Sequence, residues 1–390
     1  MRNQHKIAFN RRYPSVEDLR EKARKRIPRF AYDYLDGGCN DEVNLNRNTC
    51  EIREVQLQPD YLSKYKGTDV STTLFGHTYS APFGVAPIGL QGLFWPGASR
   101  ILAKAAFEHK LPFILSTVAT SPIEEICEIT EGKAWFQFYH PVSNEIRDNL
   151  IDRAEAAGAE VLVLLCDVPT FGYRPKEIRS GLSMPPRMTL NNILQMLAHP
   201  HWSLATLREG KPGFANLKPY MPNGLNLGQL GQFMDQTFDK RLNEDKIGPI
   251  RDRWKGKLVL KGVASASDMK KAIKLGMDGV IISNHGGRQL DAGEATISSL
   301  KRLAWLYGDQ MAIIMDGGLR SGPDIARAMA TGAAFTFMGR PFMYGVAALG
   351  RKGGPHTISM LKTQLKQIME LLVCSATREL YRHLLSENPD

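Results

Sequence analysis

The feature that most constrains the fold is an alternation, repeated along the chain, of short apolar runs with helical patterns. The runs are apolar throughout rather than at every second position, which is typical of parallel strands buried on both faces. Eight such runs predict a closed (β/α)8 barrel, since an open doubly wound sheet usually has fewer strands. The expected strands cover residues 83–86, 113–116, 134–139, 161–166, 258–261, 279–283, 312–316 and 334–338.

Amphipathic patterns between these runs supply the helices that a barrel requires, at residues 98–109, 144–157, 266–275, 297–306 and 324–331. Before the barrel, Ser15 and Asp18 have the spacing of a capping box and begin a helix that ends near Ile27. A second helix begins near Phe30 and ends at the glycine pair 37–38. We expect residues 1–75 to form a helical segment packed on a barrel of residues 76–380.

One interval breaks the regular spacing, because about 90 residues separate the fourth and fifth predicted strands. The insertion covers about 180–245 and follows the carboxyl end of the fourth strand, the side on which barrel active sites are built. It is rich in apolar residues: Met184, Met188, Leu190, Ile193, Leu194, Met196, Leu197 and Trp202. We expect it to be an active-site lid or a membrane-contact loop.

Composition excludes several classes of protein. No apolar run approaches the roughly 20 residues of a membrane-spanning helix, and the first 30 residues lack the apolar core of a signal peptide. The five cysteines are scattered without a Cys-x-x-Cys pair, which argues against a disulfide scaffold or a metal site and predicts a reduced, cytoplasmic environment.

The basic charge is concentrated at the N-terminus. Residues 1–30 hold ten Lys and Arg against three acids, within a formal net charge of +10 for the chain. Such a segment is either a solvated helix face or a site of attraction to anionic lipid. Nucleic acid is the least favoured partner, because the segment lacks interleaved aromatics and no zinc-finger or RNP spacing occurs.

The most informative motif is Ser-Asn-His-Gly-Gly-Arg-Gln at residues 283–289, directly after the sixth predicted strand. His285 is a candidate base near neutral pH, and Arg288 can hold a carboxylate in bidentate fashion. The two glycines would let the backbone approach a flat ligand closely.

Other polar residues end neighbouring strands. Asp167, after the fourth strand, can orient a histidine, although it could also cap a turn. Lys261, ending the fifth strand, is a Schiff-base nucleophile, a cation facing a developing anion, or a structural lysine. Gln137 and Tyr139 alternate with apolar residues on the third strand and are assigned to a ligand.

Two glycine-rich turns with arginine follow the seventh and eighth strands, which is the recurrent phosphate site of barrel folds. The first contains Asp316, Gly317, Gly318 and Arg320, and the second contains Gly339 and Arg340. Glycine amides and arginines suit a phosphate dianion.

Taken together, these residues resemble the FMN-dependent α-hydroxy-acid dehydrogenase and oxidase family over about the whole chain. The resemblance implies an FMN-containing barrel in which His285 is the base and Asp167 stabilises its imidazolium. It also implies substrate carboxylate contacts from Arg288, Arg174 and Tyr34, with Tyr139 beside the substrate hydroxyl.

The resemblance implies cofactor contacts at every strand end. Lys261 would face flavin N1, Ser116 and Gln137 the pyrimidine edge, and Pro87, Ile88 and Gly89 the ring. The remaining implied contacts, from the sixth strand and from the ribityl and phosphate loops, are Ser283, Asp316, Gly317, Gly318, Arg320, Gly339 and Arg340.

Three positions depart from or subdivide the family pattern. Leu165 stands where the family usually has a Thr that contacts the flavin, so one hydrogen bond is lost or replaced. Val118 stands where glycolate oxidases carry a large aromatic residue, which predicts a roomier pocket. Gly89 stands where the oxidases mostly carry Ala and the membrane-linked dehydrogenases carry Gly.

The expected function is oxidation of an (S)-2-hydroxy acid, L-lactate first, to the 2-oxo acid, with electrons passed to a membrane quinone. The alternatives are a soluble oxidase that produces hydrogen peroxide and, in a different class, a Schiff-base aldolase using Lys261. The resemblance also implies a homo-oligomer, a tetramer. We expect a cytoplasmic enzyme, peripheral on the inner face of the cytoplasmic membrane.

Overall fold

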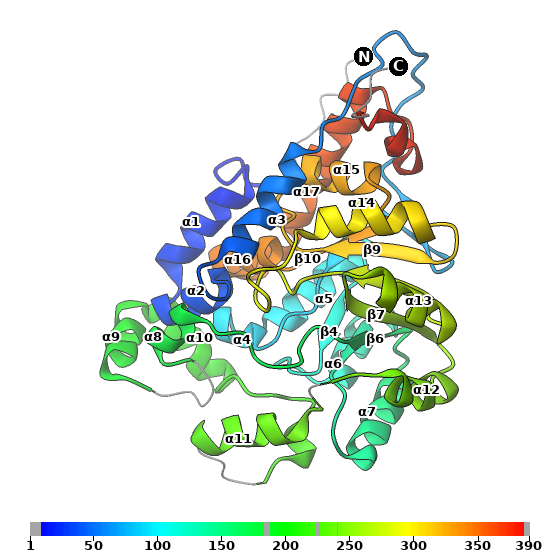
Figure 1. Cartoon of the computed structure of the whole chain (residues 1–390). Coiled ribbons are helices and arrows are strands. Elements are labelled where there is room, and N and C mark those ends of the chain that lie inside the picture. The colour runs from blue at the N-terminus through cyan, green and yellow to red at the C-terminus, as the bar shows by residue number, and fades with distance from the viewer. Residues whose placement is uncertain (1–8, 183–187, 223–226, 240, 386–390) are drawn as a thin grey trace.

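Eight parallel strands form a barrel at the centre of the computed structural model, which describes residues 9–182, 188–222, 227–239 and 241–385 (Figure 1). In sheet order the strands are β3 (Phe83–Val85), β10 (Phe335–Met338), β9 (Ala312–Asp316), β8 (Gly279–Ile282), β7 (Lys257–Val263), β6 (Val161–Leu165), β5 (Trp135–Phe138) and β4 (Ile114–Ser116). A parallel bridge between Val85 and Phe113 joins the two ends and closes the barrel. The predicted eight strands and the barrel fold are confirmed.

The barrel interior is a packed apolar core rather than a channel. Trp135 and Phe337 meet edge to face with ring centroids 5.2 Å apart. A hairpin of β1 (Thr72–Leu74) and β2 (His77–Tyr79) packs against this core, and its Phe75 ring lies 5.7 Å from Trp135. The hairpin, whose turn coincides with the proposed boundary at residue 75, was not among the predicted elements.

Helices surround the barrel. Those predicted from the pattern are present within two residues of their expected bounds: α5 (Ala98–Glu108), α7 (Asn144–Ala156), α13 (Ala266–Lys274), α14 (Thr296–Tyr307) and α15 (Gly322–Ala330). Further helices are α3 (Val43–Glu54), α4 (Gln91–Phe94), α6 (Ile123–Ile129), α12 (Glu244–Arg253), α16 (Arg340–Leu349), α17 (Gly353–Leu372) and the 3₁₀ turns η2 (Gly350–Lys352) and η3 (Thr377–His383).

The N-terminal helices lie where the sequence places them. In α1 (Val16–Arg26), Ser15 Oγ accepts from the Asp18 amide and Asp18 accepts from the Ser15 amide, which confirms the capping box. Helix α1 packs along α16, and α2 (Arg29–Asp36) contacts α4, α8 and α16 (Figure 1). Helix α2 therefore reaches the rim of the barrel.

The insertion between β6 and β7 contains α8 (Pro175–Ser180), α9 (Leu190–Ala198), α10 (Pro200–Glu209), η1 (Lys218–Tyr220) and α11 (Leu227–Thr237). Of these, α8 contacts α2, Trp202 of α10 donates to the Leu93 carbonyl of α4, and α11 lies apart from both (Figure 1). Met184, named from the insertion sequence, lies outside the described residues. No helix in the described part of the chain combines the length and apolar character needed to cross a bilayer.

Truncation of the barrel core should be costly. Phe337 is fully buried, so Phe337→Ala should lower the free energy of unfolding by about 3–5 kcal/mol through lost burial and a residual cavity. Trp305→Ala is the control, because Trp305 is 86% exposed and its loss should change stability by about 0.5 kcal/mol or less. Denaturant unfolding measures both, and equal effects would contradict the packed interior.

Candidate active site

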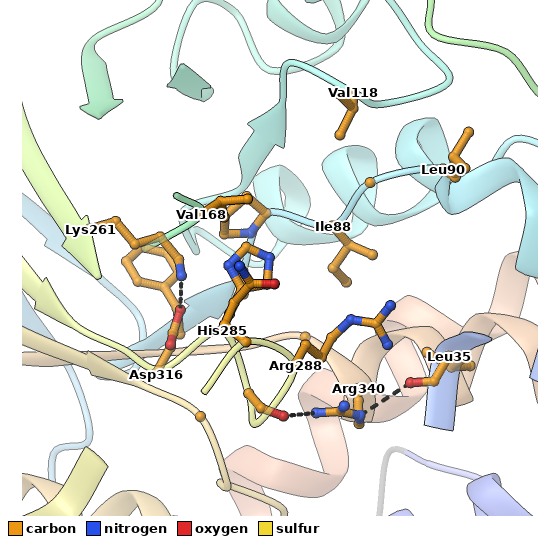
Figure 2. Close-up of a pocket in the computed structure, with 18 of the residues that line it drawn as sticks. Leu35, Ile88, Leu90, Val118, Val168, Lys261, His285, Arg288, Asp316 and Arg340 are labelled. Atoms are coloured by element: carbon orange, nitrogen blue, oxygen red, sulfur yellow. Dashed lines mark hydrogen bonds and ion pairs between the residues drawn. The ribbon is translucent and has the colours of Figure 1, made fainter. Parts of the chain in front are cut away.

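A pocket of about 190 Å³ opens at the carboxyl ends of the barrel strands. Most residues predicted for the site line it: Tyr34, Pro87, Ile88, Gly89, Tyr139, Arg174, Lys261, His285, Arg288, Asp316, Gly317, Gly318, Arg320, Gly339 and Arg340. Figure 2 shows His285 between the Lys261–Asp316 pair on one side and Arg288 and Arg340 on the other. Residues far apart in the sequence thus meet at one rim, because parallel strands end together.

Four predicted residues stand just outside the lining. Ser116, Gln137 and Ser283 are buried at the ends of β4, β5 and β8. The Asp167 carboxylate contacts the site through His285. Although alternation on β5 predicts that Gln137 and Tyr139 point the same way, only Tyr139 lines the pocket.

His285 and Asp167 form a hydrogen-bonded pair, with 3.2 Å between His285 Nδ1 and Asp167 Oδ1. Burial lowers the pKa of His285 below its ordinary value, even though Asp167 acts to raise it. Burial also acts to raise the pKa of Asp167, but His285 and Lys261 outweigh it and hold that pKa low. At neutral pH the pair is a neutral imidazole beside a carboxylate, which is a base with a ready counter-ion.

The turn that carries His285 has an unusual backbone. His285, Gly286 and Gly287 have φ values of +57°, +63° and +73°, so three consecutive residues are left-handed. A Cβ at Gly287 would meet the Leu45 backbone at 2.5 Å. Packing of α3 against the turn therefore requires glycine at position 287. The sequence prediction for the glycine pair was a different one, a close approach of the backbone to a flat ligand.

Lys261 is a buried cation with its charge compensated. Its Nζ donates to Ser283 Oγ at 2.7 Å and lies 3.1 Å from Asp316 Oδ2 (Figure 2). Burial acts to lower the pKa of Lys261, but Asp316 and Asp167 outweigh it and raise the pKa above the ordinary value. A Schiff-base lysine has to be neutral to attack, so the aldolase alternative lacks its nucleophile.

Both arginines predicted at the substrate carboxylate are bridged by one acid that the sequence analysis did not select. Glu177 Oε1 accepts from Arg288 at 2.6 Å, and Glu177 Oε2 accepts from Arg174 at 3.4 Å. The side chain of Glu177 is only 7% exposed. Two cations and one acid leave a net charge of +1, which attracts a monocarboxylate. The three-residue spacing of Arg174 and Glu177 was the sequence signal from which their pairing could have been predicted.

The carboxyl end of α2 is tied to the barrel by two arginines. Arg288 Nη1 donates to the carbonyls of Tyr34 and Gly37 at 2.7 and 3.0 Å. Arg340 donates to the carbonyls of Leu35, Gly37 and Gly286 at 3.1, 2.8 and 2.9 Å (Figure 2). These bonds satisfy carbonyls that a helix end leaves unpaired and place Tyr34 over the pocket.

The pocket wall opposite the charged groups is apolar. Phe94, Phe171, Phe214 and Phe238 line it with Val118, and the four aromatics were not predicted as site residues. Burial raises the pKa values of Tyr34 and Tyr139, the latter with a contribution from Asp167, so both hydroxyls stay protonated donors at neutral pH. A Cβ at Gly89 would meet Val118 Cγ2 at 2.9 Å, so these two positions are sterically coupled.

The donor set fits FMN. Burial and the charge of Arg320 lower the pKa of Arg340 to about 10, and burial also lowers the pKa of Arg320. A bound phosphate dianion would stabilise both buried guanidinium groups. Asp316 Oδ1 is buried without a partner in the described part of the chain, so it is free for a ligand hydroxyl. Lys261 would supply the cation that stabilises negative charge on a reduced flavin ring.

Comparison with known proteins agrees with the geometry. The model of the FMN-dependent dehydrogenase family matches residues 23–387. The chain is 34% identical to an L-lactate dehydrogenase of Vibrio cholerae, covering 94% of this chain and 97% of the relative. It is 35% identical to an L-lactate dehydrogenase of Haemophilus influenzae, covering 92% and 94%.

Solved structures give the same result. A monotopic membrane protein, (S)-mandelate dehydrogenase, superposes with a TM-score of 0.89 at 32% identity, covering 96% of this chain and 99% of that one. A mandelate oxidase superposes with a TM-score of 0.80 at 28% identity, covering 95% and 97%.

The fold, the site and these matches define an FMN-dependent 2-hydroxy-acid dehydrogenase. The chain belongs to the FMN-dependent dehydrogenase family, uses FMN as its cofactor and oxidises a 2-hydroxy acid.

The Asp167 carboxylate should shift the pH dependence of the reaction in a defined direction. Asp167 raises the pKa of His285, so in Asp167→Asn the acid limb of kcat/KM should move to lower pH. The plateau should also fall, by about 10²–10⁴-fold, because the imidazolium loses its counter-ion. A stopped-flow pH profile measures both, and an acid limb that moves to higher pH would contradict the pairing.

Proposed function

We propose that this enzyme oxidises (S)-2-hydroxy acids, L-lactate among them, and passes the electrons to a membrane quinone. The observation that carries the reaction is the His285–Asp167 pair facing a carboxylate site of net charge +1 across the same pocket. FMN supplies the two-electron acceptor for this chemistry. The named substrates of the relatives, L-lactate and mandelate, both carry the group that this pocket suits.

Each residue has a part in that proposal. His285 takes a proton from the substrate, and Asp167 stabilises the resulting imidazolium. Arg288 and Arg174 hold the substrate carboxylate with the Tyr34 hydroxyl, while Tyr139 lies beside the substrate hydroxyl. Lys261 faces the developing charge on the cofactor.

The other cofactor assignments stay part of the proposal. Pro87, Ile88 and Gly89 would lie along the flavin ring, and Ser116, Gln137 and Ser283 would contact its polar edge. The ribityl chain and phosphate would be held by Asp316, Gly317, Gly318, Arg320, Gly339 and Arg340.

The insertion supports membrane contact because α9 shows an inverted amphipathic pattern. Leu190, Leu194 and Leu197 are 82%, 64% and 72% exposed, whereas Asn192 of the same helix is buried and bonds the Ser180 carbonyl. A helix that faces water buries its leucines instead. Leucines exposed in this way suit the apolar part of a bilayer.

Exposed cations accompany these leucines. Arg208, Lys211 and Lys218 are exposed in the same insertion, and the basic N-terminal helix adds Arg24 and Lys25 at its last turn. Cations beside an apolar face favour an anionic leaflet. We therefore place the enzyme peripherally on the inner face of the cytoplasmic membrane, and we assign it the tetrameric state implied by the family resemblance.

L-Lactate should reduce the bound flavin of the anaerobic holoenzyme, with bleaching of its visible absorbance. His285→Gln should keep FMN bound but slow that reduction by about 10²–10⁴-fold, because a glutamine amide is not a base near neutral pH. Reduction at the unaltered rate in His285→Gln would contradict the assignment of the base. Absence of reduction by every 2-hydroxy acid tried would contradict the function.

Membrane contact and the choice of acceptor are tested together. Leu190→Glu and Leu194→Glu should abolish co-sedimentation with vesicles of anionic phospholipid, whereas Trp305→Glu, at an equally exposed apolar residue on α14, should not. The substrate-reduced enzyme should be reoxidised faster by a soluble quinone analogue than by air-saturated buffer. Rapid peroxide formation without vesicle binding would favour the soluble oxidase instead.

A further inference from the structure

A second and much larger cavity adjoins the catalytic pocket. Its volume is about 1550 Å³, and it lies among α2, α4 and the insertion helices α8, α9 and α10. Its lining is mainly apolar and includes Phe30, Leu93, Met196 and Trp202. None of these four residues lines the catalytic pocket, so the cavity is an additional space rather than part of the cofactor site.

The two spaces share a boundary at the substrate end of the site. Tyr34, Leu90, Phe171, Arg174 and Phe214 line both of them. Tyr34 and Arg174 are the residues assigned to the substrate carboxylate. A substituent on the carbon next to that carboxylate would therefore lie at the boundary with the large cavity.

The cavity is far larger than lactate requires. The methyl group of lactate is about the size of one water molecule, roughly 30 Å³, against a cavity of about 1550 Å³. An apolar lining of this extent is suited to hydrocarbon, because transfer of each methylene group from water to an apolar site is favourable.

The cavity also reaches the exposed apolar face of the insertion. Met188, Leu197, Leu204 and Leu207 line it and are themselves 57%, 72%, 53% and 79% exposed. Of these residues, Leu197 also belongs to the α9 surface assigned to the bilayer. An amphipathic molecule held in the membrane surface could enter from there with its carboxylate directed toward Arg174.

We infer that this cavity is a subsite for the alkyl chain of the substrate, and that the enzyme prefers (S)-2-hydroxy acids with a medium or long unbranched chain over L-lactate. The inference rests on the proposed function and leaves its chemistry unchanged. The 2-hydroxy acid loses two electrons and two protons to become the 2-oxo acid, and His285 receives one of the protons. Bound FMN would supply the two-electron acceptor, and the quinone would finally take up the two electrons and two protons as quinol.

Chain length is the variable to test. Anaerobic flavin reduction should be measured in the holoenzyme with L-lactate, (S)-2-hydroxyhexanoate and (S)-2-hydroxyoctanoate, below their micellar concentrations. We expect kcat/KM to rise at least tenfold from lactate to the eight-carbon acid. Reduction by lactate with no gain from the longer chains would overturn the inference and leave the proposed function standing, whereas reduction by none of them would overturn both.

A bulky side chain placed in the cavity distinguishes loss of the alkyl-chain subsite from a general loss of activity. Met196→Trp adds bulk where Met196 lines the cavity, and it should lower kcat/KM for the eight-carbon acid at least tenfold while changing that for lactate less than twofold. Asn191→Trp on the same helix, at an exposed residue outside the lining, should change neither. An equal loss for both acids in Met196→Trp, or a loss confined to reoxidation by a long-tailed quinone, would contradict the substrate assignment.

Discussion

The site depends on how positive charge is balanced at the barrel mouth. Arg174 and Arg288 are only 14% exposed, and burial lowers the pKa values of Arg320 and Arg340. Cations cannot be desolvated without compensation. Glu177, the carbonyls at the end of α2 and the expected phosphate supply it, and each of these partners also fixes the geometry of the site.

That balance explains why an N-terminal helix belongs to a barrel active site. The end of α2 receives hydrogen bonds from Arg288, a predicted substrate residue, and from Arg340, a predicted phosphate residue. Its own anchor is Asp36, which accepts from Arg20 at 2.7 Å and from Tyr344 at 2.6 Å. The residues proposed for the substrate carboxylate and for the cofactor phosphate are thus tied to this helix by one connected set of bonds.

The insertion after β6 adds residues to the active site and to the surface that the barrel itself does not provide. Barrel enzymes vary their function through the loops at the carboxyl ends of the strands. Here the loop after β6 contributes Glu177 to the arginines, Phe214 and Phe238 to the pocket wall, and α9 and α10 to an exposed apolar surface. One segment therefore bears on substrate charge, pocket shape and proposed location.

The sequence by itself determined the barrel and the chemical core of the site. Continuous apolar runs indicated strands buried on both faces, and polar residues at their carboxyl ends had to meet at one rim, so His285, Lys261 and Arg340 were expected there. Their individual roles came from the residue motifs and the family resemblance. Only the tertiary structure decided which partners these residues have. Glu177 between two arginines, Leu45 against Gly287, the hairpin against the core and the cavity beside the pocket all arise from contacts between segments distant in the chain. Such contacts leave no periodic signal in the sequence, because the side chains that make them are chosen by packing rather than by local repeat.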